Sequence, residues 1–274
     1  MTIPTLPGPF WLVGCGNMAG AMLARWIEAG IDRGKITVIR PSGRAVAEGV
    51  RVLTRYPEDE VPALVMLGTK PQKINEVAPL LAPILDPETV LVSILAGIEM
   101  ESLRARFPAP RTIVKAMPNT PVRLGKGVTN LFGPNGREEA RRLVADLMSA
   151  LGRVEWFEDE RLFQAAGILS GAGPAFLFRF LDALAEAGAA LGLPQEQSAR
   201  LAEAMVEGAA ALAASSEESP FELAERVASP GGTTRAGLSV LDDGEALRRL
   251  IRDTLAAGFR RSREMAEEAR ARSS

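Results

Sequence analysis

A short apolar run that ends in a glycine-rich turn constrains the fold of this sequence more than any other feature. Phe10–Val13 leads directly into Gly14-Cys15-Gly16-Asn17-Met18-Ala19, and an amphipathic helical pattern follows until Gly30. The apolar face of that helix carries Met22, Leu23, Trp26 and Ile27. A strand, the pattern G-x-G-x-x-A and a helix, in this order, predict the first unit of a dinucleotide-binding sheet.

The small residues of this turn have distinct physical tasks. Gly14 permits the tight turn, Gly16 lets the backbone approach a pyrophosphate, and Ala19 lets the helix pack closely against the strand. We therefore expect the following residues of the turn to bind a cofactor: Gly14, Gly16, Asn17, Met18 and Ala19. Cys15 is interpreted as a small residue of the turn, with no chemistry assigned to it.

The end of the next strand bears on the choice of coenzyme. A site for NAD carries an Asp or Glu about 20 residues beyond the glycines, whereas Ile36–Ile39 runs into Arg40-Pro41-Ser42-Gly43-Arg44. Two guanidinium groups and a hydroxyl suit a 2′-phosphate, so Arg40 and Ser42 predict NADPH, with NADH as the second choice. The alternative is that Arg40 and Arg44 are solvated residues at a helix start.

Further apolar runs alternate with helical patterns through the first half. They lie at Val50–Leu53, Ala63–Leu67, Val90–Ile94 and Ile113–Val114, with a helical segment at Ile74–Leu85. This alternation predicts an α/β fold with a parallel, doubly wound sheet, in which ligands bind at the carboxyl ends of the strands. We expect a strand at Val128–Phe132, a helix at Arg137–Leu151 and an edge strand at Val154–Phe157.

Three loops follow strand ends and supply further cofactor candidates. From Gly68–Gln72, Leu95–Gly97 and Met117–Pro121 we select Thr69, Lys70, Pro71, Ala96, Gly97 and Asn119. Pro118 and Pro121 stiffen the third loop and leave Asn119 and Thr120 displayed between them. Lys70 is interpreted as reaching a phosphate, a ribose or a carboxylate; the alternative is a solvated lysine at the beginning of a helix.

From Arg161 onward the apolar spacing is helical almost throughout. Glu158-Asp159-Glu160 marks the change, so we predict a Rossmann-like dinucleotide-binding domain at 1–158 and an all-α domain at 159–274. The expected helices span Leu162–Leu169, Pro174–Leu191, Gln195–Ala214, Thr234–Leu241 and Glu245–Ala271, and a capping box, Ser219-Pro220-Phe221-Glu222, begins another. Their Ala- and Gly-rich faces bury little area each, so we expect the helical half to form a homodimer.

Two stretches rich in small residues are interpreted as helix starts. Ser229-Pro230-Gly231-Gly232-Thr233-Thr234 places unpaired backbone N–H groups beside hydroxyls at the positive end of a helix dipole. That arrangement suits a small anion such as a substrate carboxylate, and an ordinary Pro-Gly break with Thr as N-cap is the alternative. Gly171-Ala172-Gly173-Pro174, preceded by Ser170, is either a second such start or a plain turn between helices.

Composition removes several classes of function. The 274 residues include no histidine, which excludes a Ser-His-Asp triad, His-ligated zinc and a His general base, and we predict no metal site. One cysteine excludes an internal disulfide, and a net charge of −2 gives no reason to expect nucleic acid or an anionic membrane. The N-terminus has no signal-peptide pattern and no apolar stretch approaches about 20 residues, so we expect a cytoplasmic protein without a membrane span.

Together these stretches resemble the pyrroline-5-carboxylate reductase family over essentially the whole length. The resemblance is carried by Gly14–Ala19, Lys70–Gln72, Met117–Pro121, Ser170–Phe176 and Ser229–Thr234. The first is generic, and the last three in this order are specific to the family. The resemblance implies reduction of 1-pyrroline-5-carboxylate to L-proline with NAD(P)H, the last step of proline biosynthesis. It also implies an interleaved helical homodimer, which in many members assembles further into a decamer.

Carried over residue by residue, the family's substrate site matches the Ser229–Thr234 helix start. The resemblance implies that Ser229, Gly231, Gly232, Thr233 and Thr234 hold the carboxylate and the ring, and that Glu217 lies at a matching position. Thr234 is the candidate for hydrogen-bonding the ring nitrogen, because a protonated imine needs positioning rather than a strong acid. The chain departs from the family at Gly68-Thr69, where an apolar pair is usual, and at Lys115, where Arg is common. Neither departure changes the predicted chemistry.

Two other interpretations stay open. An imine or hydroxy-acid dehydrogenase of the same architecture would use a Lys general base in the helical half, yet every lysine lies in the dinucleotide half: Lys35, Lys70, Lys73, Lys115 and Lys126. A non-catalytic NADPH-binding regulator would keep the glycine-rich turn but would not need Ser229–Thr234. An assay of NADPH oxidation with pyrroline-5-carboxylate separates all three.

Overall fold

The structure, a computed structural model that describes residues 3–271, divides into two compact units. The first unit holds the sheet and extends to Ala172, and the chain from Phe259 onward belongs to it again. The second unit, Gly173–Gly258, is built from helices. Residues 159–172 thus group with the sheet, because Phe163 is buried among sheet residues. The functional division into 1–158 and 159–274 stays a prediction.

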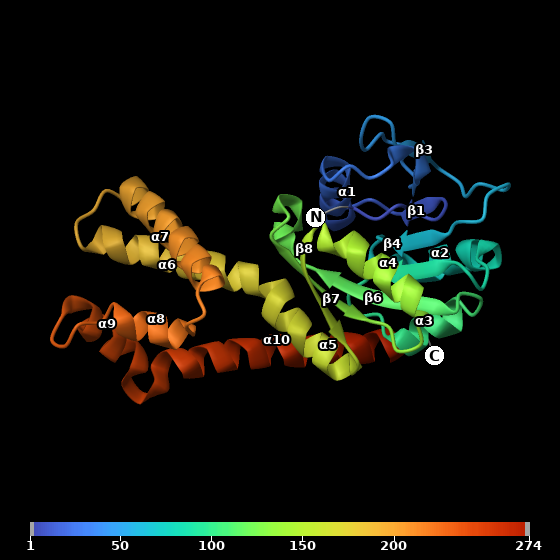
Figure 1. Ribbon diagram of the computed structural model, residues 1–274. Helices are drawn as coiled ribbons and strands as arrows, with labels where there is room; N and C mark the ends of the chain where they lie inside the picture. Colours follow the sequence, from blue (N-terminus) through green and yellow to red (C-terminus); the bar gives the residue numbers. More distant parts are fainter. Residues whose placement is uncertain (1–2, 272–274) are drawn as a thin grey trace. The chain divides into compact units, whose positions relative to one another are not determined.

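The first unit contains an eight-stranded sheet (Figure 1). Its strands are β1 (Phe10–Val13), β2 (Ile36–Ile39), β3 (Arg51–Leu53), β4 (Leu64–Leu67), β5 (Val90–Ser93), β6 (Thr112–Pro118), β7 (Gly127–Phe132) and β8 (Gly152–Phe157). They lie in the order β3-β2-β1-β4-β5-β6-β7-β8, so that β8 is an edge strand as predicted. The order turns back after β3, which makes the carboxyl ends of β1 and β4 the expected place for a ligand.

Two strands run against the predicted direction. β6 and β7 pair antiparallel, with Lys115 opposite Phe132, whereas all other neighbouring strands pair parallel. The connection between them holds only a short 3₁₀ helix, Thr120–Leu124, and Gly125 in the left-handed region. A parallel return needs a crossover of about a dozen residues or more, so this short link forces β7 to reverse. Because β8 pairs parallel with β7, both strands run opposite to β1–β6, and the prediction of a parallel sheet is wrong at these two strands.

Alternate residues of the strands contribute to two separate cores. Phe10 and Leu12 pack with α1 (Asn17–Glu28) and α4 (Glu138–Ser149) on one face of the sheet. Trp11 and Val13 pack with residues of α2 (Ile74–Leu81), α3 (Met100–Arg106) and α5 (Glu160–Ala166) on the other. Helices on both faces confirm the predicted doubly wound architecture. The helix expected at Ile74–Leu85 ends earlier, and Ala82–Ile84 forms a 3₁₀ turn around Pro83.

A long helix connects the two units without a break. It consists of α5, a π-helical segment at Gly167–Ala172, and α6 (Gly173–Ala190). The helix start predicted at Gly171–Pro174 is therefore wrong. Pro174 has no N–H to donate to the carbonyl of Ser170, and this carbonyl accepts a hydrogen bond from Asn119 Nδ2 at 2.9 Å instead. A partner from outside the helix satisfies the group that proline leaves unpaired.

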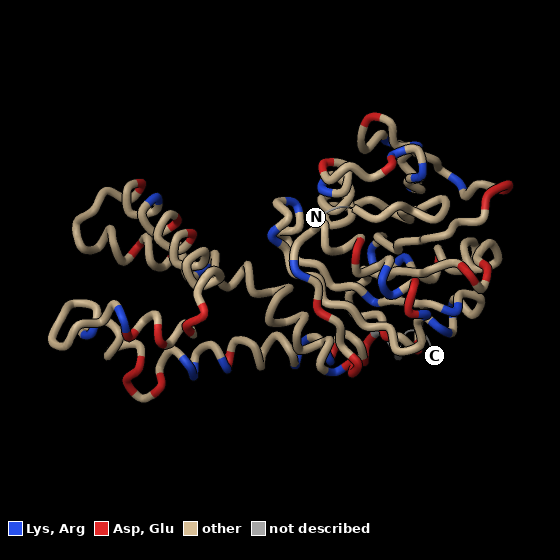
Figure 2. The backbone as a smooth tube through the Cα atoms, viewed as in Figure 1, with Lys and Arg blue, Asp and Glu red and all other residues tan. Residues whose placement is uncertain are grey.

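Residues 160–190 form the one helix of the described chain that is long and apolar enough, by length and composition alone, to span a membrane. We predicted no such stretch, because no uninterrupted apolar run of the sequence approaches about 20 residues. Figure 2 draws most of this helix in the colour of uncharged residues. Helices that bury an apolar face in protein have the same composition.

The second unit adds α7 (Gln195–Ser215), α8 (Pro220–Arg226), α9 (Thr233–Asp242) and the first part of α10 (Ala246–Ala271). α6 and α7 pack at Gly188, where an added Cβ would lie 2.2 Å from Ser198 Oγ. The Ser198 hydroxyl donates to the carbonyl of Ala185 at 2.8 Å. The capping box predicted at Ser219 is confirmed, with both reciprocal hydrogen bonds to Glu222 present.

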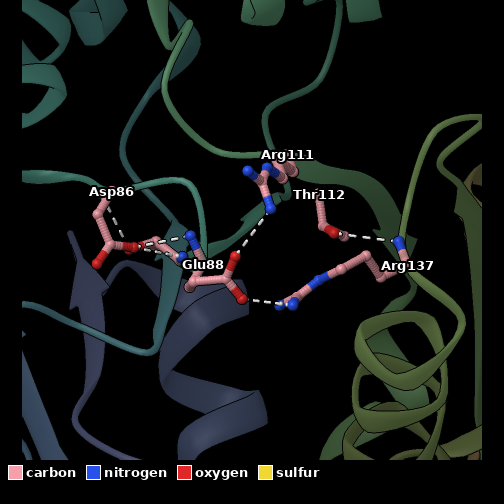
Figure 3. Close-up of polar contacts among 6 residues, drawn as sticks. Asp86, Glu88, Arg111, Thr112 and Arg137 are labelled. Atoms are coloured by element: carbon pink, nitrogen blue, oxygen red, sulfur yellow. Dashed lines mark hydrogen bonds and ion pairs between the residues drawn. The ribbon is translucent and has the colours of Figure 1, made fainter.

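A cluster of charged residues lies at the amino ends of β5 and β6 and joins them to the start of α4 (Figure 3). Glu88 accepts from Arg111 at 3.2 Å through one carboxylate oxygen and from Arg137 through the other. The backbone N–H of Arg137 also donates to Thr112 Oγ1 at 3.2 Å. These contacts tie the start of α4 to the end of the sheet opposite the cofactor loops.

Candidate functional site

The glycine-rich turn has the geometry that its sequence predicts. Gly14 has a φ of +84°, and an added Cβ would lie 2.7 Å from Thr69 Cγ2 and 2.9 Å from Thr69 N. Its N–H donates to the carbonyl of Ile39 at 2.8 Å, which joins the ends of β1 and β2. Only glycine fits this position, because both its φ and its close neighbours exclude a side chain.

The start of α1 presents open backbone to an anion. Gly16 is the N-cap, and a Cβ on it would meet none of the described atoms within 4 Å. Gly16 and Asn17 are exposed, and in the described chain no side chain caps this helix start. Ala19 is buried at 1% exposure, and a Cβ on Gly68 would lie 3.0 Å from its Cβ. Helix and strand thus approach closely while the first N–H groups of α1 stay available.

A buried hydroxyl beside the turn tests whether a dinucleotide fits. Thr69 Oγ1, at the end of β4, is one of two buried side-chain polar atoms without a hydrogen-bond partner in the described residues. An unpaired buried hydroxyl is costly unless a ligand or water completes it. With the open helix start next to it, this unpaired group fits a cofactor phosphate or ribose.

Arg40 is the cation that we predict to receive the 2′-phosphate of NADPH. It follows β2, and its backbone N–H donates to the carbonyl of Leu53 at 2.9 Å. Burial raises the pKa of the Cys15 thiol, and the Arg40 guanidinium opposes that rise, which places the guanidinium near the glycine-rich turn. Ser42 is exposed, and its hydroxyl accepts from the backbone N–H of Arg44 at 3.4 Å. Lys70 is exposed and directly precedes the 3₁₀ helix Pro71–Lys73.

Two cavities open at the carboxyl ends of β5 and β6. The smaller, about 250 Å³, brings together Met18, Ala96, Gly97 and Pro118. The larger, about 780 Å³, extends from Pro71, Ala96 and Gly97 along α2 and α3 to the last turns of α10. The structure thus gathers the predicted cofactor residues Met18, Pro71, Ala96 and Gly97 around connected surfaces of the first unit.

Lys115 lines the smaller cavity, although we assigned it no role from the sequence. Its Nζ donates to Glu160 Oε1 at 2.5 Å and lies 5.2 Å from the ring centroid of Phe163. The same carboxylate oxygen accepts from the backbone N–H of Met100 at 3.1 Å. Glu160 therefore links the end of β6 to the start of α3, directly after the Ala96–Gly97 loop. No local pattern indicates this pair, because its members lie far apart in the sequence.

Asn119 is placed differently from its prediction. It is 6% exposed rather than displayed, because its amide donates to the Ser170 carbonyl and its oxygen accepts from Val128 N at 2.8 Å. Asn130 Nδ2 donates to Ser170 Oγ at 2.7 Å. The side chain of Asn119 is thus committed to joining β7 and the π-helical segment. That Asn119 contacts the cofactor stays a prediction. Only the backbone of Asn119 remains available for such a contact. Thr120 is exposed, as predicted.

The predicted substrate residues form one exposed turn in the second unit. α9 begins at Thr233 with Gly232 as N-cap, and no described side chain caps it. Gly232 N–H donates to the Ser229 carbonyl at 3.0 Å, so this N–H is used within the turn. The N–H groups of Thr233 and Thr234 have no intrahelical acceptor by helix geometry. Ser229, Gly231, Thr233 and Thr234 are all exposed. Glu217 is exposed beyond the other end of α8.

The described residues contain no group of three or more His, Cys, Asp or Glu that could hold a metal ion. Figure 2 shows acidic and basic residues in both units. The cofactor candidates belong to the first unit, and the substrate candidates belong to the second unit.

Two family models match separate parts of the chain. The sequence profile described as "Pyrroline-5-carboxylate reductase dimerisation" matches residues 160–265, and "NADP oxidoreductase coenzyme F420-dependent" matches residues 10–97. The chain is 36% identical to the pyrroline-5-carboxylate reductase of Pseudomonas aeruginosa over 93% of this chain and 96% of that protein. It is 32% identical to that of Pisum sativum, over 96% and 98%.

Solved structures give the same result. A pyrroline-5-carboxylate reductase from Coxiella burnetii superposes with a TM-score of 0.88 at 32% identity, covering 94% of this chain and 98% of that one. A Plasmodium falciparum pyrroline carboxylate reductase with NADP bound has a TM-score of 0.84 at 23% identity, over 96% and 100%, a likeness of fold.

Proposed function

The chain belongs to the pyrroline-5-carboxylate reductase family, and from this membership we propose its function. It is an NAD(P)H-dependent oxidoreductase that acts on a CH–NH group and reduces 1-pyrroline-5-carboxylate to L-proline, the last step of proline biosynthesis. One observation carries this conclusion. A chain that covers 96% of a curated reductase combines the open glycine turn at β1–α1 with the exposed start of α9, which no described side chain caps.

The cofactor, when bound, supplies the hydride, and the residues of the first unit bind and orient it. In this proposal the N–H groups at the start of α1 hold the pyrophosphate, next to the unpaired Thr69 hydroxyl. Arg40 and Ser42 receive the 2′-phosphate, so NADPH is preferred over NADH. Lys70, Pro71, Ala96, Gly97 and Asn119 complete the predicted cofactor set.

The substrate needs two forms of recognition, one for its carboxylate and one for its ring nitrogen. The unpaired N–H groups at the start of α9 suit the carboxylate, since a helix N-terminus favours an anion without a basic side chain. Thr234 then hydrogen-bonds the ring nitrogen, and Ser229, Gly231, Gly232, Thr233 and Glu217 complete the set. A cyclic imine takes a proton from water and becomes electrophilic at carbon, so orientation and exclusion of water are the tasks left to the protein.

The test is NADPH oxidation followed at 1-pyrroline-5-carboxylate, with Thr234→Ala as the variant. A hydrogen bond to a charged partner contributes about 1.5–3 kcal/mol, so kcat/KM should fall roughly ten- to a hundred-fold while the dissociation constant of NADPH is unchanged. Thr233→Ser, which keeps the hydroxyl and the helix start, is the control with near-wild-type turnover. Wild-type turnover by Thr234→Ala removes this residue from the role, and an inactive wild type contradicts the function.

Assembly and location complete the proposal. The chain oligomerises, since the match to a dimerisation profile covers 160–265, and it acts as a soluble enzyme like its relatives. We propose a homodimer through the helical half, with assembly to a decamer as in many family members, in the cytoplasm. A lysine general base is not favoured, because Lys115, which lines the smaller cavity, is committed to Glu160.

A further inference from the structure

We propose that Arg235 and Glu225 form a positioning pair that holds the Ser229–Thr234 turn in its anion-binding conformation. The inference rests on the proposed function, because it assigns a role within the same substrate site. Glu225 lies on α8 and Arg235 in the first turn of α9, so the pair joins the two helices that the turn connects.

The contact is a bidentate fork with an additional anchor. Arg235 Nη1 donates to Glu225 Oε1 at 3.0 Å, and Nη2 donates to Glu225 Oε2 at 2.7 Å. Nη2 also donates to the carbonyl of Ala228, at 3.2 Å. Ala228 is 5% exposed and directly precedes Ser229, so one guanidinium holds both ends of the turn. Two parallel N–H···O bonds give this pair a defined geometry that a single contact lacks.

The turn itself has little else to hold it. Between Ser229 and Thr234 the described backbone makes one bond within the turn, from Gly232 N–H to the Ser229 carbonyl. Gly231 has a φ of +70°, and a Cβ on it would meet no described atom within 4 Å. A turn with two consecutive glycines has many alternative conformations. The fork between its flanking helices reduces them to those in which the start of α9 faces solvent.

The pair also determines which hydrogen-bond donors remain available to bind the substrate carboxylate. Arg235 is the cation nearest in sequence to the start of α9, yet two of its nitrogens are bound to Glu225 and Ala228. The hydrogen bonds from Arg235 lower the pKa of Glu225, and those from Glu225 raise the pKa of Arg235, so both are charged at neutral pH. The guanidinium charge is thereby compensated, and the backbone N–H groups remain as anion ligands.

The experiment measures KM for 1-pyrroline-5-carboxylate, kcat and the NADPH dissociation constant for Arg235→Ala and Glu225→Gln in the full chain. Both variants should raise this KM by about three- to ten-fold, the range for a partly exposed but bidentate pair. The NADPH dissociation constant should not change. Arg200→Ala removes an arginine from an exposed pair with Glu196 on α7 and is the matched control, with wild-type KM.

Glu225→Gln separates positioning from direct binding. This variant leaves the guanidinium in place and frees it, so a direct substrate ligand would give an unchanged or lower KM. A rise in KM in both variants, with faster amide hydrogen exchange confined to residues 228–234, supports the pair. An unchanged KM in either variant overturns it. Arg235→Lys keeps the charge without the fork and should also raise KM; wild-type KM there overturns the inference even if Arg235→Ala does not fold. Absence of turnover in the wild-type enzyme contradicts the proposed function instead.

Discussion

At the scale of single residues, Arg40 determines the expected coenzyme preference. An acid at this position would accept from the ribose 2′-hydroxyl of NADH, whereas a guanidinium pairs with the 2′-phosphate of NADPH. We expect Arg40→Asp to invert the ratio of kcat/KM for the two coenzymes by about a hundred-fold or more. Steady-state kinetics with each coenzyme measure this ratio. An unchanged ratio contradicts the assignment.

Burial distinguishes two lysine–glutamate pairs that otherwise match. Lys115 and Glu160 lie 2.5 Å apart with side chains 8% and 28% exposed, and Lys73 and Glu76 lie 2.6 Å apart at 57% and 67%. Removing one partner of a buried pair leaves an uncompensated charge. Lys115→Ala should therefore lower the free energy of unfolding by about 2–4 kcal/mol, and Lys73→Ala by less than about 0.5 kcal/mol. Urea unfolding measures both, and equal losses contradict this account.

Which residues could be predicted from the sequence depends on where their partners lie. Gly14, Gly16 and Ala19 act through neighbours in the same turn, so spacing alone identifies their geometry. Asn119 and Lys115 act through Ser170 and Glu160, which are distant in the sequence and meet them only in the folded chain. Local patterns carry no information about such pairs, so the prediction for Asn119 missed its partner and Lys115 was assigned no role.

At the scale of elements, the spacing of apolar residues predicted most helices and strands. The errors lie at short elements and short connections. α3 was not predicted because Met100–Arg106 has few residues and three of them are charged. The direction of β7 depends on the length of a link, which the apolar pattern of the strand does not report. The π-helical segment contains Ser170, which accepts hydrogen bonds from Asn119 and Asn130, and the sequence pattern does not report these distant partners.

The pairing of β7 with β8 depends on two glycines that face each other. Gly152 has a φ of +137°, and an added Cβ would lie 2.1 Å from the carbonyl oxygen of Gly127. Gly152→Ala should cost about 2–4 kcal/mol, from backbone strain and overpacking together. Gly20→Ala in α1, whose nearest contact would be Cys15 Sγ at 3.8 Å, should instead stabilise by about 0.5–1 kcal/mol. Thermal unfolding of the two variants checks the contrast, and a tolerated Gly152→Ala would be inconsistent with this register.

The cap of α8 predicts a pH dependence. Hydrogen bonds from the Ser219 backbone N–H and hydroxyl lower the pKa of Glu222 below its ordinary value of 4.5. A lowered pKa means that this contribution is complete above the ordinary pKa and is lost as pH falls through the lowered one. In hydrogen exchange, α8 amides of wild type should be better protected than those of Glu222→Gln near neutral pH. The difference should shrink below about pH 4.5; a difference independent of pH would contradict the cap.

At the scale of the whole molecule, the second unit exposes many large apolar side chains. Phe178 is 61% exposed, and Leu177, Phe180, Leu201 and Met205 are among the other exposed apolar side chains of α6 and α7. Such a surface indicates an interface, and the dimerisation profile covers it. Phe178→Asp should shift the protein toward monomers in sedimentation velocity, while Val61→Asp, at 53% exposure in the sheet unit, should not. A dimer that survives Phe178→Asp would contradict assembly through α6.

We propose that the start of α9 binds the substrate acid without a basic side chain. The decisive experiment is a crystal structure of the enzyme with NADP⁺ and proline. We expect the proline carboxylate at the backbone N–H groups of Thr233 and Thr234, with the Thr234 hydroxyl at the ring nitrogen and Arg235 still paired with Glu225. A proline carboxylate bound instead to Lys70, Lys115 or an arginine of the sheet unit would contradict it.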